Sequence, residues 1–373
     1  MIKVAIVQRR IAPFRISFFE RLNGRKSFDF TVFYALKSDI NGVTFKTKKF
    51  HLKSIKIGNS IIGLSFGLFW PLLSQAYDVV VLEGAISNIT YLLLIPLLKA
   101  RKKKLCWWSC GFEPFGTNRI KKGMRNFLYR LVCKSVDNIV VYSSKANKYY
   151  QSLKKDSSKV LTAVNVLDER IVLVIDKSIG PVYIKEIKNS YDLEGKKIIL
   201  FVGKIEPQKK LSLLLVAYML LLSSGWRNKV ALLIVGDGRE RARCQYFAKK
   251  HSLVDIHFLG EIRNLKEVSI FFRISDIFVL PGAGGLAIHH AMLFGLPVVV
   301  SSADGTEEDL VIDKKTGLFF RPDDSEDLAN KLDILLSKGE NDLKEIGERA
   351  RDRALNDFPM DKMVDKFEEA ILN

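Results

Sequence analysis

Residues 277–300 read IFVLPGAGGLAIHHAMLFGLPVVV and contain one full alternation of strand and helix. The apolar run Ile277–Leu280 ends at a glycine-rich segment. Leu286–Phe294 then has a helical pattern that Gly295 ends, and Pro297–Val300 starts a second apolar run. Two buried strands joined through a helix form a parallel pair. This stretch therefore predicts an α/β fold whose parallel sheet is covered on both faces.

The same alternation continues on both sides of this stretch. In the first half, the expected strands are Lys3–Val7, Asp29–Tyr34, Asp78–Leu82, Lys104–Trp108 and Asn138–Tyr142. The helices expected between them are Phe14–Leu22, Asn88–Lys99, Lys121–Cys133 and Ser144–Leu153. In the second half, the further strands are Ile198–Val202, Val230–Val235 and Ile256–Leu259, and the further helices are Leu211–Leu222, Arg239–His251, Leu265–Arg273 and Ser325–Leu336.

A chain of 373 residues is long for a single hydrophobic core, so two α/β domains are expected. A polar segment interrupted by glycine and proline separates the two series of strands. We expect a first Rossmann-like domain over residues 1–178, a linker over 179–197 and a second domain over 198–357. A last helix over 358–373 lies beyond the second sheet and can return to the first domain. Two doubly wound halves of this kind bind ligands at the carboxyl ends of their strands, in a cleft that they share.

The composition is that of a folded protein without a membrane span. Hydrophobic residues make up 48% and charged residues 27%. No apolar run approaches the length of about 18 residues that a spanning helix needs. The chain opens directly with a strand, so a cytoplasmic location is expected. The four cysteines, Cys106, Cys110, Cys133 and Cys244, lack zinc-site spacing and are expected to be buried free thiols.

Charge distinguishes the two halves. Residues 1–180 contain 31 Lys and Arg against 11 Asp and Glu, a net charge of +20, whereas the rest of the chain has a net charge of −2. This asymmetry indicates an anionic partner for the first half: a nucleic acid, an acidic membrane surface or a phosphorylated substrate. Nucleic acid is the least favoured of the three, because no recognition module is visible in the sequence.

Two glycine-containing turns follow strands of the second half. After the first, Gly203 lets a ligand approach the backbone, and Lys204 and Lys209 can neutralise a diphosphate. A solvated lysine-rich turn is the alternative interpretation. The turn Gly236–Gly238 is by itself an ordinary turn signal.

The glycine-rich loop at 282–286 opens a helix whose N–H groups and dipole can meet a phosphate. His290 on that helix could reach a ligand, or it could be a packed histidine of the core.

Taken in order, these segments resemble the C-terminal domain of family 4 glycosyltransferases, which have the GT-B fold. The resemblance runs from about Ile198 to Leu336. It includes Gly-Lys-x4-Lys, Gly-Asp-Gly, Phe258-Leu259-Gly260-Glu261, the strand before Pro281, the glycine-rich helix start and Thr316-Gly317-Leu318. The opening Gln8–Phe19 is similar to a subgroup of bacterial polysaccharide-assembly transferases.

The resemblance implies a transferase that moves a sugar from a nucleotide diphosphate donor, with retention of configuration and no bound metal or cofactor. Lys204 and Lys209, with Gly203 beside them, would hold the departing diphosphate. The backbone at Gly260, Glu261 and Ile262 would meet the base. The remaining implied donor contacts are Gly282, Ala283, Gly284, Gly285, Leu286 and His290. No Asp-x-Asp element is present, which agrees with metal-independent chemistry.

The sequence departs from this family at three places. The family has a Glu at each end of a seven-residue spacer, one for the donor sugar and one for the ribose; here these positions are Gly282 and His290. The side chain of His290 can still form a hydrogen bond with a ribose hydroxyl, whereas glycine cannot replace a carboxylate. A family histidine of the first domain is also missing, and Ser109 and Cys110 occupy that region.

The acceptor is expected to be a glycan or a lipid-linked molecule, reached at the inner face of the cell membrane. The residues assigned to this acceptor or membrane side are Arg9, Arg10, Arg15, Lys121, Lys122 and Arg125. In 121–133 the basic residues alternate with an apolar stripe at helical spacing, Met124, Phe127, Leu128, Leu131 and Val132. The stripe could also pack into the core.

The sequence thus favours a glycosyltransferase of cell-surface polysaccharide synthesis, of O-antigen, capsule or exopolysaccharide. Two alternatives stay open: a catalytically silent scaffold that binds nucleotide sugars, and a GT-B nucleotide-sugar epimerase.

Overall fold

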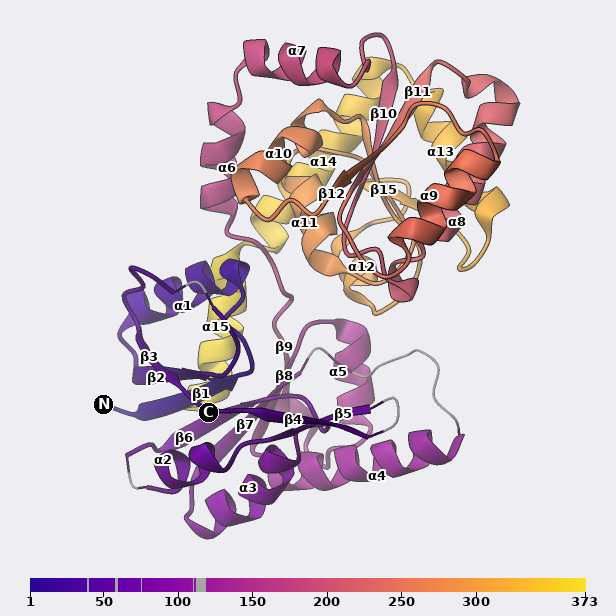
Figure 1. Cartoon of the computed structure of the whole chain (residues 1–373). Coiled ribbons are helices and arrows are strands. Elements are labelled where there is room, and N and C mark those ends of the chain that lie inside the picture. Colours follow the sequence, from indigo (N-terminus) through magenta and orange to yellow (C-terminus); the bar gives the residue numbers. More distant parts are fainter. Residues whose placement is uncertain (39, 58–59, 75, 110, 112–118) are drawn as a thin grey trace. The chain divides into compact units, whose positions relative to one another are not determined.

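A computed structural model describes the chain except residues 39, 58–59, 75, 110 and 112–118. The side chains of residues 54–57, 60–62 and 119–122 also lie outside the described part. The chain forms two compact units (Figure 1). The first comprises Met1–Val164 with Met360–Asn373, and the second comprises Asn165–Pro359.

The first unit is built on a seven-stranded parallel sheet in the order β3-β2-β1-β6-β7-β8-β9. Its strands are β1 (Lys3–Gln8), β2 (Asp29–Tyr34), β3 (Lys46–Lys49), β6 (Val79–Glu83), β7 (Lys104–Ser109), β8 (Asn138–Val141) and β9 (Val160–Thr162). A separate antiparallel hairpin consists of β4 (Lys53–Ile57) and β5 (Ser60–Leu64). The helices are α1 (Pro13–Arg25), α2 (Phe69–Leu73), α3 (Ile89–Ala100), α4 (Arg119–Ser135), α5 (Ser144–Gln151) and α15 (Met360–Leu372), with the short turns η1 (Phe66–Leu68) and η2 (Ser157–Lys159).

The second unit is built on a six-stranded parallel sheet in the order β12-β11-β10-β13-β14-β15. Its strands are β10 (Lys197–Val202), β11 (Val230–Val235), β12 (Ile256–Gly260), β13 (Ile277–Leu280), β14 (Val298–Val300) and β15 (Gly317–Phe319). Its helices are α6 (Glu169–Ser178), α7 (Pro181–Ser190), α8 (Leu211–Leu221), α9 (Arg241–Lys250), α10 (Leu265–Ile274), α11 (Gly285–Leu293), α12 (Thr306–Leu310), α13 (Ser325–Leu336) and α14 (Glu340–Asp357), with the short turns η3 (Pro207–Lys209) and η4 (Leu222–Trp226).

The central strands are apolar along their whole length because both faces of each sheet are covered. In β11 every residue is buried, and in β1 all but the first are. Polar side chains set where helices begin: Asn88 accepts from the backbone of Thr90 at α3, and Asn264 accepts from Lys266 and Glu267 at α10. Each such cap is worth about 1 kcal/mol.

The last helix, α15, packs on the sheet of the first unit. Its Phe367 ring lies 4.5 Å from the Trp108 ring and 5.2 Å from the Phe18 ring, measured between centroids. The Asn138 side chain donates to the carbonyl oxygen of Ala370 at 2.7 Å. The expectation that the C-terminal helix returns to the first domain is confirmed.

The doubly wound architecture expected from the sequence is confirmed, and the structure adds detail at the unit boundary. The segment expected as a linker, 179–197, contains helix α7 and the first residue of β10. The second unit begins at Asn165, before the expected boundary at 178, because α6 belongs to it. Its Glu169 and Val172 are buried there.

Each sheet has one point where the strand order reverses. In the second unit, β11 and β12 lie on one side of β10, while β13, β14 and β15 lie on the other. The loops after β10 and β13 therefore leave the same edge of the sheet in opposite directions. Open α/β sheets bind their ligands at such a point, outside the carboxyl ends of the strands.

Candidate functional site

The loops after β10 and β13 dock on each other at this reversal point. The amide of Ala283 donates to the carbonyl oxygen of Gln208 at 3.1 Å. A Cβ atom on Gly282 would lie 2.0 Å from that same oxygen, so position 282 has no room for a side chain. The absence of a carboxylate at 282 thus goes together with close backbone contact between the two loops.

Lys209 extends from the first of these loops over the second. Its Nζ donates to the carbonyl oxygen of Ala283 and lies 2.3 Å from where a Cβ on Gly284 would be. Burial is the main effect on the pKa of Lys209 and lowers it; the carboxylate of Asp304 raises this pKa and the charge of Lys204 lowers it. Lys204 itself is exposed. The two lysines expected to act together therefore lie within electrostatic reach of each other.

Helix α11 begins directly beside the Lys209 ammonium. Gly284, with φ 149°, precedes the helix, and no side chain caps it. Uncapped N–H groups at a helix start carry partial positive charge and suit an anionic oxygen. Gly203 and Ala283 belong to these two loops, and Gly285 and Leu286 are the first residues of α11, so the structure brings the expected phosphate-side residues together.

The turn after β11 joins this edge from the other side. A Cβ on Gly236 would lie 1.9 Å from the carbonyl oxygen of Gly203, and the amide of Gly236 donates to Gly260 at 2.7 Å. Gly260 ends β12 with φ 79°. The segment assigned to the base, Gly260 to Ile262, thus continues the row of loops, with the Glu261 carboxylate exposed and bonded to Arg263 at 2.6 Å.

His290 does not lie at this edge. Its side chain is 4% exposed; its Nε2 is 3.1 Å from the Ser269 hydroxyl of α10, and its ring centroid is 4.0 Å from that of Phe272. Burial lowers the pKa of His290 to about 3. The side of α11 that contains His290 therefore faces α10. The structure places His290 in the core between these two helices and not at a position open to a ribose.

A carboxylate pair that the sequence analysis missed follows β14. Asp304 accepts from the amide of Thr306 at 3.0 Å, and Thr306 lies against Gly285 at the start of α11. Glu307 is fully buried and accepts from the amides of Ala303 and Gly305. The signal was an Asp-Gly-Thr-Glu run that begins at Asp304, in the loop after the expected strand Pro297–Val300.

The pKa of Glu307 is raised to about 7, mainly by burial and also by the nearby charge of Asp304. Its Oε2 has no hydrogen-bond partner in the described structure. Glu307 thus organises the loop that carries Asp304, and Asp304 in turn acts electrostatically on Lys209.

The residues assigned to the acceptor or membrane side separate in the first unit. Arg9 binds Glu83 through its Nε at 2.9 Å and its Nη2 at 2.8 Å, at the reversal point between β1 and β6. Arg10 is exposed. Arg15 is buried, with its guanidinium 4.2 Å from the Trp108 ring, so Arg15 stabilises the core instead of forming an open surface.

The other three residues assigned to this side, Lys121, Lys122 and Arg125, are in helix α4. The side chains of Lys121 and Lys122 lie outside the described residues, and Arg125 is half-buried. Cys110, which lies in the region where the family has a histidine, is also outside the described residues. Ser109 is buried, and the Tyr150 hydroxyl donates to its Oγ at 3.0 Å.

Three cysteines are buried free thiols, as expected: Cys106, Cys133 and Cys244. Burial raises the pKa of Cys106 and Cys133 to about 12 and that of Cys244 to about 11. They are therefore protonated at neutral pH. Among the described residues, no helix combines the length and the apolar character that crossing a bilayer requires.

Comparisons with known proteins agree with this architecture. Residues 184–353 match the family of group 1 glycosyl transferases. The chain is 25% identical over 248 residues to the N-acetyl-alpha-D-glucosaminyl L-malate synthase of Bacillus anthracis, covering 65% of this chain and 61% of that enzyme. It is 26% identical over 193 residues to the lipopolysaccharide 1,2-N-acetylglucosaminetransferase of Salmonella typhimurium, covering 48% of this chain and 49% of that enzyme. The chain thus spans less than two thirds of each of these two relatives.

A solved structure of HepE from Anabaena in complex with UDP and glucose is similar in fold. It has a TM-score of 0.74 at 14% identity and covers 99% of both chains. The two doubly wound units thus have the GT-B fold, and the second unit contains the region that matches the group 1 glycosyl transferases.

Proposed function

We propose that this glycosyltransferase takes a sugar from a nucleotide diphosphate donor, which binds the second unit. The observation that carries the proposal is the Lys209 ammonium, held over the start of α11 by the carbonyl of Ala283. An ammonium has three donors, so Lys209 retains hydrogen-bonding capacity for a ligand. The UDP and glucose bound by HepE, whose fold this chain shares, support a donor of this class.

The proposed chemistry follows from where charge develops. When the bond between the anomeric carbon and the diphosphate oxygen breaks, the electron pair stays on the departing diphosphate. Lys209, Lys204 and the N–H groups at the start of α11 would stabilise that charge, the role that a metal ion has in other transferases. We propose that turnover needs no metal ion or cofactor, and that configuration is retained as in family 4.

For the acceptor, we propose a glycan or lipid-linked molecule of cell-surface polysaccharide synthesis. The similarity to a lipopolysaccharide N-acetylglucosaminetransferase supports this class. The net charge of +20 in residues 1–180 supports attachment to the anionic inner face of the cell membrane, where such an acceptor lies. Nucleic acid is not among the proposed partners.

Thermal unfolding with a panel of nucleotides and nucleotide sugars tests the donor proposal. A ligand that binds only the folded state raises the unfolding midpoint according to ln(1 + [L]/Kd). We expect one nucleotide diphosphate and its sugar conjugates to raise the midpoint. If no member of the panel changed it at millimolar concentration, the donor proposal would be wrong.

A silent nucleotide-sugar-binding scaffold is the second candidate. It is favoured by the glycine at position 282 and the buried His290, where the family has two glutamates. Incubation of the labelled donor with and without an acceptor fraction separates the possibilities. A transferase moves label only when the acceptor is present. An epimerase converts the donor alone, and a scaffold leaves it unchanged.

A further inference from the structure

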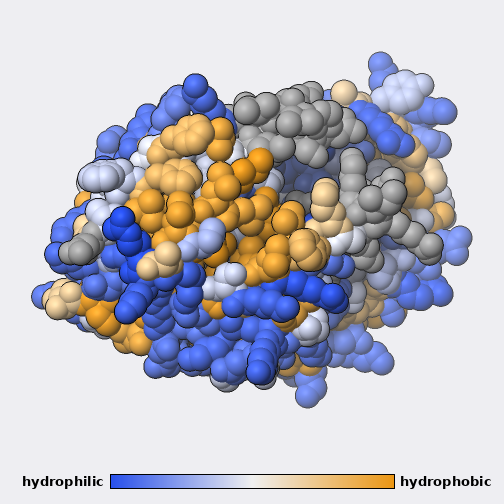
Figure 2. Space-filling view, turned by 90° about the horizontal axis from the view of Figure 1, so that it is seen from below, coloured by the Kyte–Doolittle hydropathy of each residue, from blue (hydrophilic) through white to orange (hydrophobic). Residues whose placement is uncertain are grey.

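Apolar side chains gather on one face of the first unit. Figure 2 shows them as a continuous hydrophobic area bordered by hydrophilic residues, on the side where Figure 1 places α2, α3 and α4. The apolar face is defined by seven side chains that are each at least 42% exposed: Phe66, Trp70, Leu93, Leu97, Met124, Phe127 and Leu131. Helix α3 packs against both α2 and α4, so these side chains come from adjoining elements.

The same helices also have a buried side that packs into the core, and the exposed apolar residues are not part of it. In α3 the inward side is formed by Tyr91, Leu94 and Leu98, which are fully buried, while Leu93 and Leu97 point outward. A surface helix that needs only one core face carries polar residues on the other. In α4 the stripe noted in the sequence divides: Val132 is buried, whereas Phe127 is 60% exposed. Contiguous apolar surface of this kind marks an interaction site.

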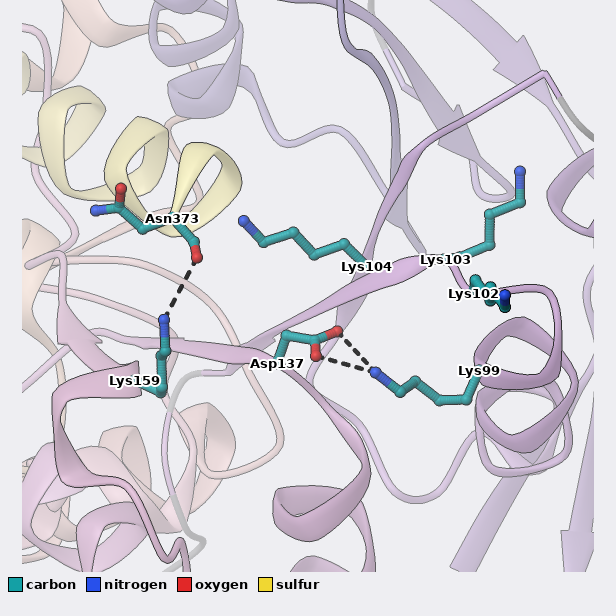
Figure 3. Close-up of a pocket in the computed structure, with 7 residues that line it drawn as sticks. All are labelled: Lys99, Lys102, Lys103, Lys104, Asp137, Lys159 and Asn373. Atoms are coloured by element: carbon teal, nitrogen blue, oxygen red, sulfur yellow. Dashed lines mark hydrogen bonds and ion pairs between the residues drawn. The ribbon is translucent and has the colours of Figure 1, made fainter.

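Lysines surround the end of α3, and their charge indicates the occupant. A hollow of about 570 Å³ is lined by Lys99, Lys102, Lys103, Lys104, Asp137, Lys159 and Asn373 (Figure 3). Lys99 binds Asp137 at 2.9 Å. Lys104 and Lys159 donate to oxygens of Ile371 and Asn373, so the hollow contains five lysines and one carboxylate side chain, that of Asp137.

We infer that the apolar face enters the interfacial region of an anionic lipid bilayer, with the exposed Lys99 and Lys102 at the end of α3 facing lipid phosphates. An apolar surface next to a basic one is the pattern of proteins that bind membranes in the interfacial plane. A second copy of this chain fits the face less well, because two lysine-rich surfaces would be brought together. The inference rests on the membrane attachment proposed above and specifies its surface. It requires nothing of the donor site.

Trp70 provides a direct readout of this contact. Its side chain is 85% exposed, whereas Trp107 and Trp108 are buried, and Trp226 of the second unit donates to Asp333 at 2.7 Å. Titration with phosphatidylglycerol vesicles should shift the tryptophan emission to shorter wavelength, and brominated lipid should quench it. The variant Trp70→Phe should still sediment with the vesicles but lose the emission shift.

The contribution of the apolar face is measured with matched variants. Phe66→Ser with Phe127→Ser should weaken vesicle binding at least about tenfold, since each removes a large apolar side chain from the contact. The control, Val174→Ser with Val182→Ser, changes exposed apolar residues of α6 and α7 in the second unit and should leave binding unchanged. Part of the parent's binding should persist at high salt, because apolar burial is not screened.

Three outcomes would overturn the inference: emission of Trp70 that is unaffected by bound vesicles, equal vesicle binding by the face and control variants, or complete release by salt. Self-association that the face variants abolish, without vesicle binding, would assign the face to a second copy instead. Nucleotide-sugar binding, measured on the same variants by thermal shift, reports separately on the donor proposal.

Discussion

Gly282 lies directly against the backbone of Gln208: a Cβ atom on residue 282 would be 2.0 Å from the Gln208 carbonyl oxygen. This contact joins the loop after β10 to the loop after β13 and brings Lys209 over the start of α11. It accounts for a glycine at a position where the family has a carboxylate.

Replacing Gly282 with Ala should therefore force the two loops apart. Overpacking of this kind costs about 1–3 kcal/mol, and the unfolding midpoint should fall together with donor affinity. Gly24→Ala is the matched control, because nothing lies within 4 Å of a Cβ at Gly24 in helix α1. A Gly282→Ala protein as stable as the parent would show that the loops are not in contact.

Glu307 should make stability depend on pH. Burial raises its pKa from 4.5 to about 7, so the folded chain holds a proton that the unfolded chain releases at lower pH. The parent should thus lose stability relative to Glu307→Gln as pH rises from about 4.5 to 7, by up to about 3 kcal/mol. Gln keeps the acceptor for the amides of Ala303 and Gly305.

Thermal midpoints of both proteins across this pH range check the expectation. Glu326→Gln, a change at an exposed residue of α13, is the control for the loss of one surface charge. Parallel curves for the parent and Glu307→Gln would contradict a buried carboxyl with a raised pKa.

His290→Ala should act on stability instead of on binding. The ring is buried against Phe272, and its removal should cost on the order of 2–4 kcal/mol, the range for large core truncations. The Kd of the nucleotide diphosphate, measured by calorimetry well below the unfolding temperature, should stay the same. Weaker nucleotide binding with unchanged stability would instead assign His290 to the ribose.

Much of the fold was predictable from local patterns. The strands Asp29–Tyr34, Val230–Val235 and Ile277–Leu280 and the helix Ser325–Leu336 have the expected bounds, because each is a strong apolar run or a capped helix between clear breakers. Helix α14 was not predicted. It is highly polar, and only packing of residues such as Ile346 and Ala350 against the second unit reveals its buried face.

The candidate site was predictable only in part, because sequence patterns locate loops but not the direction of side chains. The glycine-rich turns at Gly203 and Gly282 were found, since strand ends and helix starts are local signals. Whether His290 faced a ligand or α10 depended on the rotation of α11, which no local pattern determines. The roles of Asp304 and Glu307 depended on β14 lying next to β13, a tertiary contact.

Chelation should leave turnover unchanged, because Lys204, Lys209 and the start of α11 provide the positive charge proposed for the departing diphosphate. The measurement is the rate of transfer by purified protein in excess EDTA. Activity that is lost in EDTA and restored by Mg²⁺ or Mn²⁺ would disprove metal independence.

The role of Lys209 is tested by the kcat/KM of Lys209→Ala with the sugar nucleotide that the thermal panel identifies. Loss of one preorganised donor to a developing anion should lower kcat/KM about 100- to 1000-fold, or about 3–4 kcal/mol. Lys250→Ala, a change at an exposed lysine of α9, should match the parent in kcat/KM and in unfolding temperature, and circular dichroism at the assay temperature checks that Lys209→Ala is folded. A folded Lys209→Ala protein with unchanged kcat/KM would contradict the proposal that Lys209 stabilises the departing diphosphate.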